Sequence, residues 1–357
     1  MSSTMIKLWS EAEAIDPTLK VREQDLPNLR KKVVKPVPYS RSQMFERMGR
    51  GQVSLFSSLQ VPVRKAPSDD LREALLEGIR KGLPASRRAR VQTGPSSRRC
   101  RMRVPEVIRR WQGGRAILSV TDLHFRRTRF DKIVDTSNLS DFNILCNDPE
   151  FAPEFVQLIE MMTLVISSAG NLTDNHADDC DGTNHCFVGK KLWLAWDRIE
   201  GKAAGFQDVD RDEVFDQAAF DLQTFLSLPS ARWFTVEPDQ TLFLPGSLAH
   251  KVITLEHYIG LGSFHVALPS YLRSLERWLL QDTHDIVPKD LLWKIHKAVL
   301  RKLRELRQNQ PRMKVQWGLN ETQHAVNRWK NSKDQGSKAK LLRNPMVAEF
   351  TETVLQA

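Results

Sequence analysis

The sequence predicts an α+β fold with a mainly β core of the sandwich or barrel type and with α-helices before, within and after that core. Three observations support this. Short apolar runs between residues 190 and 268 are separated by Gly, Pro, Asp and Asn, a spacing typical of such cores. Helical periodicity flanks these runs on both sides. A chain of 357 residues with 41% hydrophobic composition can bury one sizeable core and still carry extensions.

The expected strands follow one another in chain order. Each is rich in β-branched and aromatic residues and is bounded by turn-forming residues. They lie at 115–123, 190–196, 232–237, 241–245, 250–255 and 258–268. A helical insert expected at 208–228 interrupts the series.

Helices are expected on both sides of these strands. Residues 68–83 predict one helix with Ser68 as its N-cap, and further helices are expected at 104–112, 151–162 and 288–308. In the last of these, apolar residues recur at spacings of three and four and predict a stripe that packs on the core. The stripe consists of Leu292, Ile295, Val299, Leu303 and Leu306.

Charge divides the chain into a basic, an acidic and a second basic part. Residues 1–103 hold 22 Lys and Arg against 10 Asp and Glu, residues 104–284 hold 16 against 26, and residues 285–345 hold 15 against 5. Basic flanks suit nucleic-acid phosphates, and solvated faces are the alternative reading. Residues 85–103 contain seven arginines and no acid, which predicts a linker that doubles as a nuclear-targeting or nucleic-acid patch.

These shifts in composition predict four parts of the chain. They are a basic, largely disordered extension at 1–100 with one helix near 68–83, a folded domain at 101–283, a basic helical segment at 284–345 and a tail at 346–357. Four irregularly spaced cysteines without a CxxC pair argue against a disulfide framework and a structural zinc site. We expect an intracellular protein without membrane contact, because the apolar runs are far shorter than the roughly 20 residues that span a bilayer.

One stretch, LTDNHADDCDGTNHCFVGKK (172–191), concentrates metal-binding residue types. His176 and Asp178 are two positions apart, so both side chains project from one face of a β-strand. One such pair is what chance provides in this composition. His250 begins the strand expected at 250–255 and supplies a second imidazole. Two histidines and one carboxylate form the facial triad that holds non-haem Fe(II).

Blocks around these residues resemble, in order, the JmjC-domain Fe(II)/2-oxoglutarate oxygenases, particularly the lysine demethylases associated with PHD fingers and F-boxes. The blocks are Thr173-Asp174-Asn175-His176-Ala177-Asp178, Gly182-Thr183, Gly189-Lys190-Lys191-Leu192-Trp193, Pro245, His250-Lys251-Val252-Ile253-Thr254 and Gly262-Ser263-Phe264. The resemblance covers roughly residues 101–283. It implies a double-stranded β-helix of the cupin or jelly-roll type, with His176, Asp178 and His250 as the iron ligands.

The resemblance also implies a 2-oxoglutarate site. Lys191 looks like the cation that receives the distal carboxylate, Thr173 like the hydroxyl beside it, and Asn143 like a pocket asparagine. A buried carboxylate needs a cationic partner in any case. Lys190 and Lys191 also fit a charged turn, with Lys191 the one expected to point inward. Thr173 lies three positions before His176, an odd offset that requires a bend or bulge.

The other conspicuous residues of the stretch are expected to be fillers. His185, Cys186 and Cys180 suit a soft metal, but buried or surface positions without a ligand role are the stronger expectation. Asp179 and Asp181 belong to a run that lacks the twelfth-position Glu of a calcium-binding loop, so an EF-hand is excluded.

Departures from the family pattern concern the substrate rather than the iron site. The aromatic run that the demethylases place beside methyl-lysine is missing, and Leu248 and Ser263 replace the usual Trp and Asn. The expected activity is that of a dioxygenase acting on a protein, a histone lysine demethylase or related chromatin-modifying enzyme. A protein or nucleic-acid hydroxylase of the same fold and a catalytically weak JmjC-like chromatin regulator are the alternatives.

The resemblance and the charge pattern together set the expected surroundings of the protein. The cofactor is Fe(II) and the cosubstrate is 2-oxoglutarate. The acidic middle suits a histone tail or another basic protein tail as substrate, and the basic flanks suit DNA or chromatin. The expected location is the nucleus.

Overall fold

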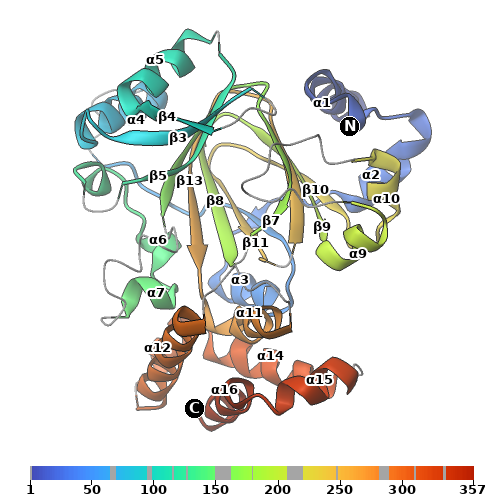
Figure 1. Ribbon diagram of the computed structural model, residues 1–357, viewed down its shortest axis with the longest axis vertical. Helices are drawn as coiled ribbons and strands as arrows, with labels where there is room; N and C mark the ends of the chain where they lie inside the picture. Colours follow the sequence, from blue (N-terminus) through green and yellow to red (C-terminus); the bar gives the residue numbers. More distant parts are fainter. Residues whose placement is uncertain are drawn as a thin grey trace.

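The structure of the protein, a computed structural model, is a mixed α/β fold built on two antiparallel sheets (Figure 1). Helix accounts for about 49% and strand for about 26%, so the expected β core with flanking helices is confirmed, with helices the larger share. Neither sheet closes on itself within the described residues. These are residues 2–64, 70–94, 99–114, 116–125, 128–148, 162–178, 180–206, 220–246, 248–280, 289–308, 311–332 and 335–357.

The larger sheet has nine strands in the order β1-β2-β11-β8-β13-β6-β5-β3-β4. Neighbouring strands pair antiparallel except β1 with β2. The strands are β1 (Val37–Pro38), β2 (Ser54–Ser57), β3 (Arg88–Thr93), β4 (Arg99–Arg103), β5 (Leu118–His124), β6 (Thr163–Ser167), β8 (Asp181–Val188), β11 (Gln240–Leu244) and β13 (Tyr258–His265).

The smaller sheet has four antiparallel strands in the order β10-β9-β12-β7. They are β7 (Leu172–Ala177), β9 (Lys191–Asp197), β10 (Arg232–Val236) and β12 (Leu248–Thr254). All the strands expected from the sequence are therefore confirmed, and β7 and β8 lie within the metal-rich stretch.

The two sheets pack against each other through one face of each. In β9 and β12, alternate residues such as Trp193 and Val252 join a buried cluster with Cys186 and Tyr258 of the larger sheet. The intervening residues, such as Leu192, face the opposite way into a second cluster. Because side chains alternate across a strand, the register decides which residues line the space between the sheets.

The N-terminal residues cover the outer face of the smaller sheet and differ from the loose extension expected there. Trp9 packs edge-on against Trp233 of β10, with ring centroids 5.3 Å apart, and the Trp233 indole donates a hydrogen bond to the Leu29 carbonyl. The short apolar runs of this region lack a long period because they pack in separate pieces. The pieces on the smaller sheet are α1 (Ser2–Ile15), η1 (Pro17–Leu19), η2 (Glu23–Asp25) and α2 (Leu26–Lys32). Helix α3 (Arg41–Gly49) packs instead into the cluster on the outer face of the larger sheet.

The arginine-rich segment is a β-hairpin and not a linker. Strands β3 and β4 pair antiparallel at the edge of the larger sheet, so the expected domain boundary at residue 100 falls inside β4. The helices α4 (Leu71–Gly82) and α5 (Val104–Gly113) lie beside the hairpin (Figure 1). The N-cap of α4 is Asp70, whose carboxylate accepts from the Arg72 amide at 2.9 Å, whereas Ser68 lies outside the described residues.

Short helical turns connect the middle strands. They are η3 (Phe130–Lys132), α6 (Ser137–Ser140), α7 (Ile144–Asn147), α9 (Arg198–Ala203) and α10 (Leu222–Ser227). The helix expected at 151–162 lies outside the described residues except for Met162. Of the insert expected at 208–228, the described part begins at residue 220 and contains α10.

The C-terminal part of the chain is a group of helices at the lower end of the molecule in Figure 1. The apolar stripe predicted for α12 is confirmed, because all five of its residues are buried. No helix among the described residues has both the length and the apolar character needed to cross a membrane. The group comprises α11 (Leu268–Leu280), α12 (Lys289–Gln308), α13 (Pro311–Gln316), α14 (Leu319–Asn331), α15 (Gln335–Leu342) and α16 (Pro345–Gln356).

Candidate metal centre

Two neighbouring strands bring the three predicted metal ligands together. Strands β7 and β12 pair antiparallel with His176 directly opposite His250, and their imidazole centroids are 4.1 Å apart. Asp178 follows the end of β7, and one carboxylate oxygen lies 3.7 Å from the His250 Nε2. Candidate ligand atoms of all three residues lie within 4.8 Å of one another. A single ion can therefore contact two imidazoles and one carboxylate.

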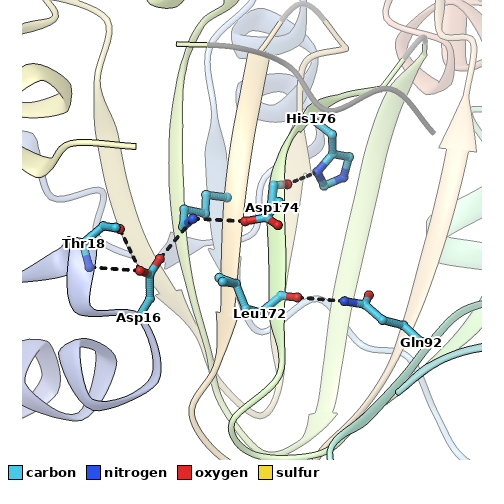
Figure 2. Close-up of polar contacts among 7 residues, drawn as sticks. Asp16, Thr18, Gln92, Leu172, Asp174 and His176 are labelled. Carbon is cyan, nitrogen blue, oxygen red and sulfur yellow. Dashed lines mark hydrogen bonds and ion pairs between the residues drawn. The ribbon is translucent and has the colours of Figure 1, made fainter. Parts of the chain in front are cut away.

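The hydrogen bonds of the two histidines leave their Nε2 atoms for a metal. The Nδ1 of His176 lies 2.8 Å from the Asp174 carbonyl (Figure 2), and the Nδ1 of His250 lies 3.4 Å from the Leu248 carbonyl. Since a carbonyl oxygen only accepts, each Nδ1 carries the proton and each Nε2 presents a lone pair. This is the arrangement by which outer hydrogen bonds orient metal-bound histidines.

Burial keeps His250 in the neutral form that a metal requires. Its side chain is 2% exposed, and desolvation, with a smaller effect of the neighbouring His176, lowers the pKa of His250 to about 3. Trp193 stacks on the imidazole with ring centroids 5.3 Å apart. The Asp178 side chain is 19% exposed, so the candidate centre is closed to solvent at His250 and open to solvent at Asp178.

A β-bulge turns Thr173 toward the same face as the histidines. Between His250 and Val252 the register with β7 shifts, so Val252 lies opposite Thr173 although Thr173 is three residues before His176. In a regular strand, residues three positions apart point to opposite faces. The extra residue that the bulge places in β7 brings Thr173 and His176 to the same face. The bend that the sequence required for Thr173 is present.

The two adjacent lysines at the start of β9 point in opposite directions. Lys191 is 4% exposed, and its Nζ lies 4.4 Å from the centroid of the Tyr258 ring. Lys190 lies at the surface and pairs with Glu237 at 2.7 Å. Burial lowers the pKa of Lys191 to about 8. Lys191 is therefore the lysine between the sheets, on the face that carries His250.

Two further polar groups on this face are buried without a hydrogen-bond partner among the described residues. They are the hydroxyl of Thr254, which lies opposite Lys191 in the sheet, and the indole nitrogen of Trp193. Buried polar groups are rarely left unpaired, because their desolvation costs free energy that a partner normally offsets. Together with the Lys191 ammonium, they form a polar strip along β9 and β12 that ends at His250.

Asn143 is the N-cap of α7, and its side-chain amide forms hydrogen bonds with backbone groups. Its Oδ1 accepts from the Leu145 and Val266 amides, both at 3.1 Å, and its Nδ2 donates to the Phe264 carbonyl at 3.1 Å. These bonds fasten the start of α7 to the end of β13. The Asn143 amide therefore has a structural role at this junction, and a role in a cosubstrate pocket stays a prediction.

The other conspicuous residues of the stretch 172–191 are structural. His185 faces away from His176, bonds to Thr241 through Nδ1 at 2.8 Å and packs edge-on against Phe187. Cys186 is buried between the sheets, and burial raises the pKa of its thiol to about 12. Cys180 is a buried free cysteine, and Asp179 lies outside the described residues.

Asp181 has a supporting role that its place in an acidic run did not suggest. Its carboxylate accepts from the Gly246 amide at 2.9 Å and pairs with Arg273 at 2.8 Å. Gly246 belongs to the turn that leads into β12 and therefore toward His250. These two interactions of Asp181 hold in place the turn that precedes β12, the strand that carries His250.

A buried ion pair behind β7 was also missed from the sequence. The Lys251 ammonium lies 3.0 Å from the carboxylate of Asp16 and 3.3 Å from that of Asp174. Asp16 in turn accepts hydrogen bonds from the amide and hydroxyl of Thr18. Figure 2 shows this chain running from the N-terminal segment to Asp174, whose carbonyl holds His176.

Comparison with known proteins adds no family assignment. No family model matches the sequence, and no curated protein matches it. The geometry of the three ligands and the polar strip beside them are the observations that bear on function.

Proposed function

We propose that this protein is an Fe(II)- and 2-oxoglutarate-dependent oxygenase whose two sheets correspond to the double-stranded β-helix of the JmjC-like enzymes it resembles. The observation that carries the proposal is the convergence of His176, Asp178 and His250, with candidate ligand atoms within 4.8 Å of one another. Two imidazoles and a carboxylate on one side of an ion suit Fe(II) and leave coordination positions for further ligands.

The residues beside the triad fit a dicarboxylate cosubstrate. A keto acid that binds iron through one end carries a second carboxylate, and the buried Lys191 ammonium is a partner for it. The hydroxyls of Thr254 and Thr173 and the Trp193 indole line the same face and are available as donors. A bound carboxylate would satisfy polar groups that otherwise lie buried and unpaired.

Bound iron and 2-oxoglutarate would supply the oxidising chemistry, which converts O₂ and 2-oxoglutarate to succinate and CO₂ and places one oxygen atom on a substrate C–H bond. The chain's own residues hold and orient these groups. Trp193 and Phe234, which stack in the same cluster with Val252 and Leu248, exclude water from one side of the site. The exposed side of Asp178 leaves an approach for the substrate.

The first substrate class to test is a methylated lysine in a basic protein tail, as in a histone lysine demethylase. Hydroxylation of an N-methyl group gives a hemiaminal, which releases formaldehyde and leaves the demethylated amine. The acidic part of the chain at 104–284 suits a cationic tail, and a chromatin substrate would locate the protein in the nucleus.

A protein or nucleic-acid hydroxylase is the second candidate, and one observation favours it. The aromatic side chain of β8, Phe187, packs into the cluster on the outer side of the larger sheet, away from the triad. The described residues between Asp178 and Lys191 therefore place no aromatic ring beside the site for a methylammonium group.

The experiment is a turnover assay with matched variants. Protein loaded with Fe(II) under anaerobic conditions is mixed with 2-oxoglutarate and O₂, with and without methylated histone peptides, and succinate and formaldehyde are measured. We expect succinate from the wild type and from His185→Gln, and none above background from His176→Ala. Formaldehyde that accompanies the succinate identifies demethylation, and succinate that rises with peptide but without formaldehyde identifies hydroxylation.

A catalytically weak regulator is the remaining alternative. In that case the wild type binds iron but forms no more succinate than His176→Ala, with every substrate tried. This result would contradict the oxygenase proposal.

A further inference from the structure

The hairpin of β3 and β4 presents an array of arginines on one face. In the register of the two strands, Arg88 lies directly opposite Arg103, and Arg90 lies directly opposite Arg101. All four are exposed, as is Arg99 one position further along. The opposite face of the hairpin is apolar, with Ala89, Val91 and Met102 buried in the core. We call these five arginines the arginine face.

Like charges directly opposite each other in a sheet destabilise it. Within the part of the chain that the structure describes, Arg88, Arg99, Arg101 and Arg103 have no carboxylate partner. The nearest acid in the sequence after the hairpin is Glu106 of α5, and Arg109 and Arg110 already engage it. Charged side chains on β4 alone would protect this sheet edge from pairing with another chain, so Arg88 on β3, directly opposite Arg103, needs a different reason.

We propose that the arginine face binds the phosphate backbone of a nucleic acid. Guanidinium groups match phosphate oxygens with two parallel hydrogen bonds and are weakly hydrated. Two-stranded β-ribbons also have the dimensions that enter a DNA major groove. A line of phosphates would neutralise the arginines of β3 and of β4 at once and relieve the repulsion between Arg88 and Arg103.

The composition of the face favours a nucleic acid over an acidic protein. Protein interfaces depend on buried aromatic and aliphatic anchors, with charges at the rim. The arginine face has no apolar side chain between its columns, because Ala89, Val91 and Met102 point the other way. A surface that is charged throughout and strongly positive is typical of nucleic-acid contacts.

The hairpin is attached to the strand that carries one of the three candidate ligands. Gln92 of β3 donates a hydrogen bond from its side chain to the Leu172 carbonyl at the start of β7, the strand that carries His176 (Figure 2). A nucleic acid on the arginine face therefore lies on the side of the molecule where β7, the strand that supplies His176, begins. The binding proposal does not depend on the oxygenase proposal, since it needs neither iron nor turnover.

The test is the salt dependence of binding to a fluorescent DNA duplex, measured by anisotropy with the full-length protein. One variant replaces Arg88, Arg99, Arg101 and Arg103 by Gln. A control with the same change in charge replaces Lys289, Lys297, Arg304 and Arg307 of α12 by Gln. Circular dichroism checks that both variants keep the wild-type fold, which the hairpin variant should do because it removes like-charge pairs.

We expect the hairpin variant to lose at least about tenfold in affinity at roughly 0.1 M salt and its log–log salt slope to become shallower by about 3 to 4, since each lost phosphate contact contributes about 0.9. The α12 control should keep most of the slope. Equal losses in the two variants would overturn the proposal by showing a response to net charge alone. Tighter binding of poly-glutamate than of duplex by the wild type would also overturn it, in favour of an acidic protein partner.

Discussion

Lys251 of β12 and Asp16 of the N-terminal segment form a buried ion pair, with the ammonium 3.0 Å from the carboxylate and both side chains 3% exposed. Asp174 of β7 shares the same ammonium at 3.3 Å. The pair joins residues far apart in the sequence across the outer face of the smaller sheet. It lies directly behind the strand positions of His176 and His250, so it supports the candidate metal centre from the side opposite the ion.

Replacing Lys251 by Met should destabilise the protein. The change leaves the carboxylates of Asp16 and Asp174 buried without their cation, and breaking a buried pair in this way costs about 3–5 kcal/mol. Urea denaturation measures the loss. A triple variant that also carries Asp16→Leu and Asp174→Leu should recover most of the stability, because it removes the buried charges together. A single variant as stable as the wild type would show that the pair is not buried in solution.

Lys191→Met should weaken 2-oxoglutarate binding, whereas Lys190→Met should not. Loss of a charge-assisted hydrogen bond of about 1.5–3 kcal/mol corresponds to a roughly 10- to 150-fold rise in KM for 2-oxoglutarate. The two lysines are adjacent, but Lys190 pairs with Glu237 at the surface. An equal rise in KM for the two substitutions would show that Lys191 does not bind the cosubstrate.

We also expect the affinity for 2-oxoglutarate to depend on pH, because Lys191 titrates near neutral pH in the free protein. Burial lowers the pKa of Lys191 to about 8, so the free protein loses the ammonium as the pH rises through 8. A carboxylate binds the charged form, and we therefore expect 2-oxoglutarate affinity to fall above about pH 8. In Lys191→Met this alkaline fall should be absent, and an unchanged profile would contradict the assignment.

Thr254→Val should raise the KM for 2-oxoglutarate by about fivefold. The Thr254 hydroxyl lies opposite Lys191 and is buried without a hydrogen-bond partner among the described residues, so a bound carboxylate gains a neutral hydrogen bond of about 1 kcal/mol there. Thr235→Val is the matched control, since Thr235 lies opposite Leu192 and so on the other face of the same sheet. A larger effect from the control would place the cosubstrate elsewhere.

His185 should make the protein less stable in acid. Burial lowers the pKa of His185 to about 4, below the ordinary value near 6.5 of an unfolded chain. Between these values the unfolded state binds the extra proton, so the free energy of unfolding falls as the pH is lowered from about 6.5 to 4. Urea denaturation at pH 6.5 and at pH 4 measures this fall in the free energy of unfolding. In His185→Gln the fall should be smaller than in the wild type by up to about 3 kcal/mol. The same fall in both proteins would show that His185 is not buried.

The candidate ligands could be predicted from the sequence because several separated blocks resemble one family in order, whereas the spacing of His176 and Asp178 alone is what chance provides. His176 lies in β7 and Asp178 directly follows that strand, and His250 lies in β12, which was recognisable from its β-branched run. The direction of Lys191 also follows from strand alternation once the start of β9 is known. The register shift that turns Thr173 was required by its odd offset from His176, although the sequence did not show where the bulge lies.

Longer-range features could not be predicted in this way. The pairing of Asp16 with Lys251 depends on how the N-terminal segment folds back over the smaller sheet, which no local pattern specifies. The arginine-rich hairpin did carry a local signal, because Arg88 to Val91 and Arg99 to Met102 alternate between charged and other residues with the period of a strand. The segment was nevertheless predicted to be a linker, because a run of seven arginines without an acidic residue is more typical of linkers than of strands.

The most direct test of the central claim is anaerobic equilibrium dialysis that measures bound Fe(II) and bound 2-oxoglutarate in the same sample. The account predicts one of each per chain for the wild type, loss of both in Asp178→Ala, and loss of 2-oxoglutarate with retention of iron in Lys191→Met. Iron bound equally well by Asp178→Ala, or 2-oxoglutarate bound equally well without iron, would contradict the assignment of this site.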